Sequence, residues 1–361
     1  MIKTLILINQ RFTKNGKNLL FNVLIFIIYI FTLGSCKKDS SDTVNSKYIV
    51  YTAGFIWNNG NFPCYWKGNS RTDLPGGTGA FTTSIFVSGG IVYTAGYYYN
   101  SKGLQAPCYW NGTTKIDLPY DITHDAYTTS IFVSNGNVYT SGHCSTGACY
   151  WVNSVRKEMV GHVDGDFYSS IYVLDTLVYL AGSYQLNKFD FKIDPCYWVG
   201  NKRTDLSVNS SNYGQANSIY ISNGTVYTCG YCGDYPRIPC YWTESIKTDL
   251  ETNINGYANS ICVEGGSVYT AGYLTTEGFG ACFWNGTSRT DLKGYSHYGT
   301  DAVSICAKGG AVFTAGRYYK PDPNNLTTGF HFPCYWIGNN RVDLQVAVDH
   351  DHNSTTSIFV E

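Results

Sequence analysis

Four short segments of this 361-residue sequence place histidine beside aspartate, and these residue types can ligate a metal ion or exchange protons. Imidazole nitrogen and carboxylate oxygen together suit a divalent cation, and the same groups can hold a polar ligand by hydrogen bonds. A solvated loop carries such residues as well, with neither role. The ten candidate residues are His124, Asp125, His162, Asp164, Asp166, His297, Asp301, His350, Asp351 and His352.

No motif in the sequence names a catalytic residue. There is no nucleophile elbow, phosphate-binding glycine loop, His-Glu-x-x-His or paired Cys-x-x-Cys. The isolated Cys229-x-x-Cys232 is half of a zinc site at most, because no second pair follows in register. The enzymatic hypothesis is therefore a metal-assisted hydrolase or lyase built on the His and Asp cluster, with a divalent metal as its cofactor.

Aromatic residues offer a second kind of site. The chain contains 32 tyrosines, and several gather in the segments that connect the expected strands. Aromatic faces suit stacking on sugars and contacts with proteins alike. The candidate aromatic face consists of Tyr97, Tyr98, Tyr99, Tyr318, Tyr319 and His331.

A sequence repeat must position these segments. A Cys-(Tyr/Phe)-Trp triplet, a Ser-Ile pair and a Val-(Tyr/Phe)-x-x-Gly segment each recur seven times, at intervals of about 40 to 50 residues. A residue that is present in every unit builds the unit rather than reacting. The repeated tryptophans, predicted to pack between units, are Trp66, Trp110, Trp151, Trp198, Trp242, Trp284 and Trp336.

One unit, from Thr83 to Leu118, contains four short expected strands separated by a tight turn, a longer loop and a second tight turn. This pattern is typical of a propeller blade. The ordered part begins with a second strand, Tyr48–Gly54, and ends with a first strand, Ser357–Val360. The sequence thus predicts an all-β, seven-bladed β-propeller of four-stranded antiparallel blades. The C-terminal strand closes it by pairing with the N-terminal three strands, whereas an open solenoid would need capping repeats.

The recurring Cys-Tyr-Trp-x-Asn-Gly-x-x-x-x-Asp-Leu pattern resembles the HAF family of extracellular repeats, which are predicted propeller-like units of secreted bacterial proteins. The resemblance covers nearly all of residues 48–361, and Glu158-Met159 replaces Asp-Leu in the third repeat. It implies an architecture and brings no catalytic residues with it. The aspartate of this pattern is predicted to accept hydrogen bonds from backbone donors in the turn that follows.

Cysteine is abundant, with 13 residues. The seven cysteines that repeat beside tryptophan cannot bond to one another, because stacked sheets lie too far apart, and we interpret them as small buried side chains. Among the others, three pairings remain open: Cys144 with Cys149, Cys232 with Cys240, and Cys262 with Cys306.

The first residues differ from the repeat. Four basic residues precede an apolar run that ends in Leu33-Gly34-Ser35-Cys36, which predicts a signal peptide over residues 1–35. This segment resembles a bacterial lipobox, which implies lipidation of Cys36, and the polar residues after it partly resemble a surface-export signal of Bacteroidetes lipoproteins. An uncleaved anchor is the alternative. Residues 36–47 are predicted to be a flexible tether, and residues 48–361 the propeller.

Charge limits the partners. Removing the leader's four basic residues leaves 21 basic against 26 acidic residues, a net charge of −5, which argues against nucleic acid as a partner.

The long, variable connections all fall on one face of the expected propeller, opposite the tight turns. The leading hypothesis is a non-catalytic lipoprotein of the cell envelope, on the outer membrane and either surface-exposed or periplasmic. It would bind a glycan, peptide or protein through its loop-rich face.

Overall fold

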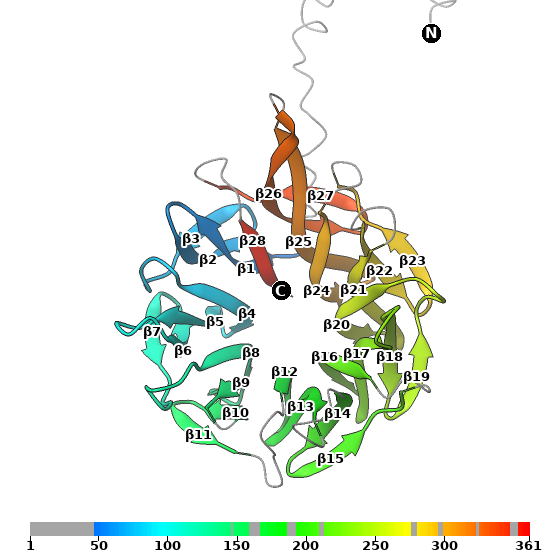
Figure 1. Ribbon diagram of the computed structural model, residues 1–361, viewed down its shortest axis with the longest axis horizontal. Coiled ribbons are helices and arrows are strands. Elements are labelled where there is room, and N and C mark those ends of the chain that lie inside the picture. Colours follow the sequence, from blue (N-terminus) through cyan, green and yellow to red (C-terminus); the bar gives the residue numbers. More distant parts are fainter. Residues whose placement is uncertain are drawn as a thin grey trace, which may run out of the picture. The chain divides into compact units, whose positions relative to one another are not determined.

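The computed structural model describes residues 47–145, 147–158, 167–185, 193–208, 213–275, 280–294, 299–322, 325–346 and 353–361, without the side chains of 325–328. Residues 49–361 form one compact unit. Its strands form seven four-stranded antiparallel sheets, which Figure 1 shows as blades around a central axis. The predicted all-β, seven-bladed propeller is confirmed.

Each blade begins with an innermost strand beside the axis and ends with an outermost strand. Blade 1 contains β28 (Ser354–Val360), β1 (Val50–Trp57), β2 (Asn61–Lys67) and β3 (Ser70–Asp73). Blade 2 contains β4 (Phe81–Ser88), β5 (Ile91–Tyr99), β6 (Gln105–Asn111) and β7 (Thr114–Asp117). Blade 3 contains β8 (Tyr127–Ser134), β9 (Asn137–Cys144), β10 (Gly147–Val152) and β11 (Val155–Lys157). Blade 4 contains β12 (Phe167–Leu174), β13 (Leu177–Tyr184), β14 (Asp194–Val199) and β15 (Lys202–Asp205).

The remaining three blades follow the same order. Blade 5 contains β16 (Gly214–Ser222), β17 (Thr225–Cys232), β18 (Ile238–Thr243) and β19 (Ile246–Asp249). Blade 6 contains β20 (Gly256–Glu264), β21 (Ser267–Leu274), β22 (Gly280–Asn285) and β23 (Ser288–Asp291). Blade 7 contains β24 (Asp301–Lys308), β25 (Ala311–Asp322), β26 (Asn325–Ile337) and β27 (Asn340–Asp343).

The two ends of the chain close the ring as the sequence predicts. The last strand, β28, pairs antiparallel with β1, and Val50 lies opposite Val360. Backbone hydrogen bonds of 2.9 Å run both ways between Ile49 and Glu361. Closure gives the first blade its fourth strand, so the complete ring of seven four-stranded blades lies within residues 49–361.

The repeated glycine of the second strand is required by a β-bulge in the first strand. In blade 2 the register of β4 shifts between Thr82 and Ser84, which brings the backbone of Phe81 against Gly96. A Cβ on Gly96 would overlap the Phe81 carbonyl oxygen and lie 2.8 Å from the Trp110 ring. The same bulge is present in every blade, so each blade excludes a side chain at this glycine.

The repeated tryptophans pack between blades, as predicted. Six are completely buried, and Trp198 is 3% exposed. In blade 2, the Trp110 Nε1–H donates to the carbonyl oxygen of Pro75, which follows the last strand of blade 1, at 2.7 Å. The equivalent bond to the preceding blade is made by Trp66, Trp151, Trp242 and Trp336. Each side chain removes about 200 Å² from water, worth at most about 5 kcal/mol. These residues are structural.

The role predicted for the repeated aspartate is wrong. Instead of capping a turn, its carboxylate pairs with the basic side chain two residues earlier, as Arg71 and Asp73 do at 2.8 Å. Side chains two apart in a strand share one face, so the fourth strand holds this pair by itself. Glu158 takes the same place in the third repeat, opposite Arg156. The other pairs are Lys115–Asp117, Arg203–Asp205, Lys247–Asp249, Arg289–Asp291 and Arg341–Asp343.

The Ser-Ile pair joins neighbouring inner strands. The Ser84 hydroxyl accepts a hydrogen bond from the Ile131 backbone N–H of the next blade at 3.2 Å. Four further seams carry this bond, made by Ser170, Ser218, Ser260 and Ser304. The serine therefore satisfies a backbone donor beside the axis, where no further strand is available.

Cysteine pairing is settled for one of the three open possibilities. Cys144 and Cys149 form a disulfide across β9 and β10, with Cα atoms 6.1 Å apart. The Cys262 and Cys306 thiols are not joined, and neither are those of Cys232 and Cys240, whose sulfur atoms lie 3.6 Å apart. All seven cysteines of the repeat are buried, as predicted.

Candidate functional site

Most of the predicted His and Asp cluster lies outside the described residues. His162, Asp164, Asp166, His297, His350, Asp351 and His352 belong to this part. Among the residues that the structure does describe, no group of three or more His, Cys, Asp or Glu could hold a metal ion. The hypothesis of a divalent metal therefore gains no support from the remaining three candidates.

Those three candidates make local contacts. His124 is exposed, and its Nδ1 lies 3.1 Å from an Asp121 carboxylate oxygen, whose pKa is lowered chiefly by a hydrogen bond from the Thr123 hydroxyl. Asp125 accepts a hydrogen bond from the backbone N–H of Gln105 at 2.7 Å. Asp301 pairs with the guanidinium of Arg317 at 2.9 Å.

The predicted aromatic face is divided by the alternation of side chains along a strand. In β5, Tyr97 and Tyr99 contact each other, with ring centres 6.2 Å apart. Tyr98 points the other way, and the Lys115 ammonium lies 3.5 Å from its ring centre. Tyr98 thus belongs to the outer wall of the blade.

The C-terminal half of that face is divided in the same way. Tyr318 is 5% exposed and lies under the Arg341 guanidinium at 3.6 Å, so it is also part of a blade wall. Tyr319 makes an edge contact with His331, at 5.4 Å between ring centres. Of the six predicted residues, Tyr98 and Tyr318 are therefore held within the fold.

A site that the residue types did not identify lies where neighbouring blades meet on the loop-rich face. We call it an interblade niche and define it by three equivalent positions. These are the residue after the second-strand glycine, the residue three before the repeated cysteine, and the residue three before the serine of the Ser-Ile pair in the next blade. Only two seams have tyrosine at both outer positions, namely Tyr97–Gln105–Tyr127 between blades 2 and 3, and Tyr231–Arg237–Tyr257 between blades 5 and 6.

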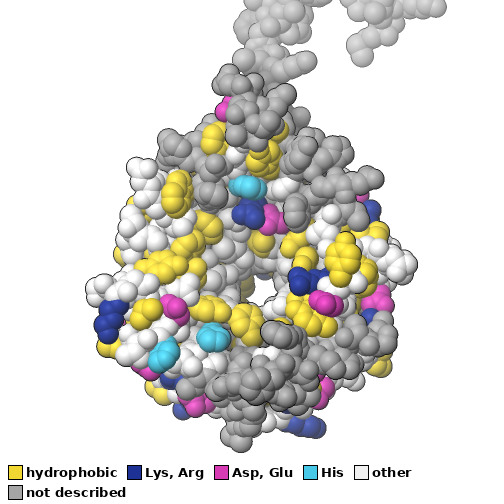
Figure 2. Space-filling view, in the orientation of Figure 1, with side chains coloured by type: hydrophobic (Ala, Val, Ile, Leu, Met, Phe, Trp, Pro, Cys, Tyr) yellow, Lys and Arg dark blue, Asp and Glu magenta, His cyan; other side chains and the backbone are white. Residues whose placement is uncertain are grey.

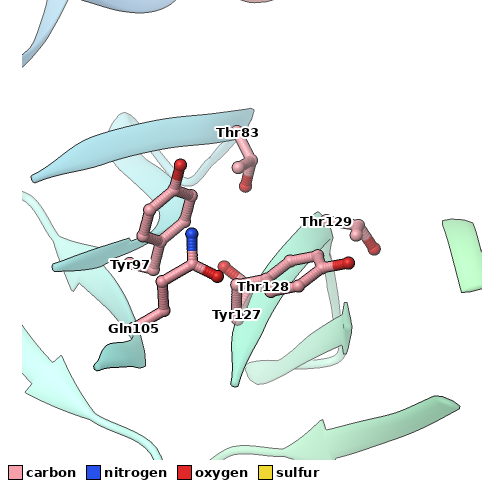
Figure 3. A pocket seen from close by; sticks show the side chains of 6 residues that line it. All are labelled: Thr83, Tyr97, Gln105, Tyr127, Thr128 and Thr129. Atoms are coloured by element: carbon pink, nitrogen blue, oxygen red, sulfur yellow. The ribbon is translucent and has the colours of Figure 1, made fainter. Parts of the chain in front are cut away.

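The niche between blades 2 and 3 is an open depression of about 440 Å³. Figure 3 shows the Gln105 amide between the rings of Tyr97 and Tyr127, with the hydroxyl-bearing side chains of Thr83 and Thr129 beside them. Burial raises the pKa of Tyr97 to about 12, and it also raises the pKa of Tyr127, because both phenols are partly shielded from water. The depression therefore offers two aromatic faces together with hydroxyl and amide donors.

Neighbouring strands hold this niche in shape. The Gln105 backbone donates to Asp125, and its carbonyl oxygen accepts from the Ala126 N–H at 3.0 Å. Tyr127 stacks on His143 at 5.6 Å and lies 6.1 Å from Tyr97. Asp125, a metal candidate by sequence, thus positions a niche residue.

The niche between blades 5 and 6 repeats this arrangement with a cation in place of the amide. The Arg237 guanidinium lies 5.3 Å from the Tyr231 ring centre and 5.5 Å from that of Tyr257. Its Nη1 donates to the Tyr257 hydroxyl, which raises the arginine pKa further. The Arg237 backbone N–H donates to the Asn255 side chain at 2.7 Å, the counterpart of the bond between Gln105 and Asp125.

Hydrophobic side chains gather beside the central opening on the face shown in Figure 2. Within the described part of the chain, no helix has the length and apolarity needed to cross a bilayer.

A signal for the niches was present in the sequence. It would have come from aligning the repeats and asking which positions vary among blades that are otherwise alike.

Comparison with known proteins assigns no family to this chain. No protein-family model matches the chain, and no curated protein matches it, so membership of the HAF family stays a prediction. Among solved structures, the chain is similar to the propeller domain of the Trilobed protease from Pyrococcus furiosus, at 10% identity, 83% and 93% coverage of the two chains and a TM-score of 0.48. It is also similar to the computationally designed Ika8 protein, at 13% identity, 79% and 91% coverage and a TM-score of 0.42. Such likeness concerns the fold alone, and the seven-bladed assignment rests on this chain's own strand pairing.

Proposed function

We propose that this protein is a non-catalytic binding module that holds a glycan in its interblade niches. The observation that carries the proposal is the niche between blades 2 and 3, where Tyr97 and Tyr127 wall a depression that contains Gln105. A sugar presents apolar C–H faces and hydroxyl edges. Aromatic rings match the first, and amide and hydroxyl groups match the second.

Variation among blades supports a binding role. Glycine and tryptophan recur in every blade because every seam needs them, whereas the three niche positions differ from seam to seam. Nothing in the packing of the blades requires tyrosine there, since one seam has Ser183 and Gln215 at the two outer positions. Side chains that the fold does not require are available for a ligand.

The proposal includes an anchor. The segment that ends at Cys36 would be cleaved and lipidated there, and the tether 36–47 would hold the propeller at the outer membrane of the cell envelope. A single acyl chain binds a bilayer only weakly, so stable attachment needs the several acyl chains of a lipidated N-terminus.

The test is a glycan array probed with residues 37–361, which contain the complete ring. We expect binding that Tyr97→Ala and Tyr127→Ala each reduce by about tenfold or more, since each removes an aromatic wall. Ile246→Ala is the control, because Ile246 is 73% exposed and begins β19 directly after a tight turn on the opposite face. Binding of peptides alone, or loss of glycan binding in the control as well, would contradict the proposal.

A further inference from the structure

Arg237 is an exception among the described arginines. Six others pair with a carboxylate: Arg71, Arg156, Arg203, Arg289, Arg317 and Arg341. No described carboxylate makes an ion pair with Arg237, whose guanidinium lies near the rings of Tyr231 and Tyr257 and donates to the Tyr257 hydroxyl. Arginine normally satisfies its five N–H donors with oxygen atoms. Within the described part of the chain, no other side chain accepts a hydrogen bond from Arg237, which leaves its remaining donors for a ligand.

The side chain is also well placed for recognition. Its backbone is fixed by Asn255 and by the Gly256 N–H, which donates to the Arg237 carbonyl at 2.8 Å. The Tyr257 hydroxyl holds one nitrogen of the fork. Fixing a guanidinium before a ligand arrives lowers the entropy lost on binding.

We propose that the niche between blades 5 and 6 binds the carboxylate of an acidic saccharide through Arg237. The inference rests on the proposed glycan function and assigns a charge to the ligand. A planar guanidinium fork matches a carboxylate by two parallel hydrogen bonds, and the rings of Tyr231 and Tyr257 would contact the sugar that carries it. The equivalent niche has Gln105 and would take a neutral sugar.

The experiment compares uronic-acid oligosaccharides with their carboxyl-reduced, neutral counterparts, by calorimetry on residues 37–361. Galacturonate, glucuronate and mannuronate oligomers form the panel. We expect at least one acidic oligomer to bind about tenfold or more tightly than its reduced form. Arg237→Gln, which gives this niche the composition of the other, should abolish the preference for the acidic oligomer over its reduced form. Arg237→Lys should retain only part of it, since an ammonium has no fork.

The outcomes separate this inference from the proposed function. Neutral glycans that bind with no acidic preference, or a preference that survives in Arg237→Gln, would overturn only the inference. No saccharide binding at all would overturn both. An oligoglutamate peptide is the third arm, and Arg237-dependent binding of it at equal affinity would overturn the assignment to a saccharide.

A second inference concerns Cys232 and Cys240, and it rests on an equivalence between blades. Cys144 lies two residues after Gly142, and its disulfide partner Cys149 lies opposite that glycine. Cys232 lies two residues after Gly230, and Cys240 lies opposite it. The other blades have isoleucine, leucine or tyrosine in place of the first cysteine. Blade 5 thus has the arrangement that blade 3 uses for its disulfide.

We infer that Cys232 and Cys240 form a disulfide when the protein folds in an oxidising compartment. Both are buried in the folded ring, so the reaction precedes burial. One thiolate attacks a small-molecule disulfide such as oxidised glutathione and releases one glutathione. The second thiolate then attacks the mixed disulfide and releases the other, so two protein thiols are oxidised as one oxidant disulfide is reduced. The bond would close the base of the loop that presents Arg237.

To test for the Cys232–Cys240 disulfide, the protein is refolded in a glutathione redox couple and alkylated in denaturant. Its peptides are then mapped without reduction. We expect a linked Cys232–Cys240 peptide beside the Cys144–Cys149 peptide, with Cys229 alkylated as the matched control. In Cys232→Ser, Cys240 should become alkylated. Full alkylation of Cys232 and Cys240 in a digest that contains the Cys144–Cys149 link, or a link from Cys232 to Cys229, would overturn it.

Discussion

The seam between blades 2 and 3 and the seam between blades 5 and 6 have the same buried residues beneath the niche, which we call its base. They differ in one residue at the opening of the niche, which we call its mouth. Gly96 and Gly230 lie opposite equivalent β-bulges of their own blades. The tryptophans of the blades that follow, Trp151 and Trp284, are both completely buried. At the mouth, one seam has Gln105 where the other has Arg237. The single exchange between them changes the charge of the niche while the backbone around it stays the same.

The largest effect is expected at the shared base. Gly96→Ala would force the new Cβ into the Phe81 carbonyl, and Gly230→Ala would do the same at Gln215. Each should lower the free energy of unfolding by about 3 kcal/mol or more, measured by urea denaturation. Gly112→Ala is the control, because Gly112 has φ of 59° but no atom within 4 Å of its Cβ position. It should cost only about 1–2 kcal/mol, and equal losses would contradict the role assigned to the bulge.

This comparison also shows what the sequence could and could not predict. Blade number, ring closure and the tryptophan seams follow from periodicity, because a residue type that recurs seven times marks a place that every blade must fill. The niches did not follow, because their residues come from three separate segments of two blades. Which neighbours point into the seam depends on a bulge that periodicity does not show. Tyr97 and Tyr98 are adjacent in sequence, yet only Tyr97 lines a niche.

The role of the repeated aspartate could have been predicted. Arg71 precedes Asp73 by two residues in a segment with the pattern of a strand, and residues two apart share a face. Strand geometry therefore outweighs turn chemistry at this position.

The His and Asp candidates show what sequence alone could not predict, since residues of the right type gather in loops whether or not they meet in space. Asp301 is held by Arg317 instead.

The second prediction sharpens the comparison at the mouth. Gln105→Arg should give the niche between blades 2 and 3 the charge of the other, because Asp125 and Ala126 already fix the backbone at Gln105. On an Arg237→Gln background, it should restore about tenfold preference for a uronate over its reduced form, about 1.4 kcal/mol. The measurement is calorimetry with the same oligomer pair. A restored preference that Tyr127→Ala leaves intact would show that the new arginine binds outside the niche.

The smallest expected effect is on alkaline stability, through the phenol of Tyr97. Burial raises its pKa from 10 to about 12 in the folded protein. Between these values the unfolded chain has lost the proton while the folded chain keeps it, so stability present below pH 10 is lost as the pH rises towards 12. Tyr97→Phe removes the titrating group, and its unfolding free energy should fall less steeply over this interval, as followed by urea denaturation at each pH. Parallel curves for the two proteins would mean that the Tyr97 hydroxyl is solvated, and that this wall of the niche is more open than its packing against Tyr127 indicates.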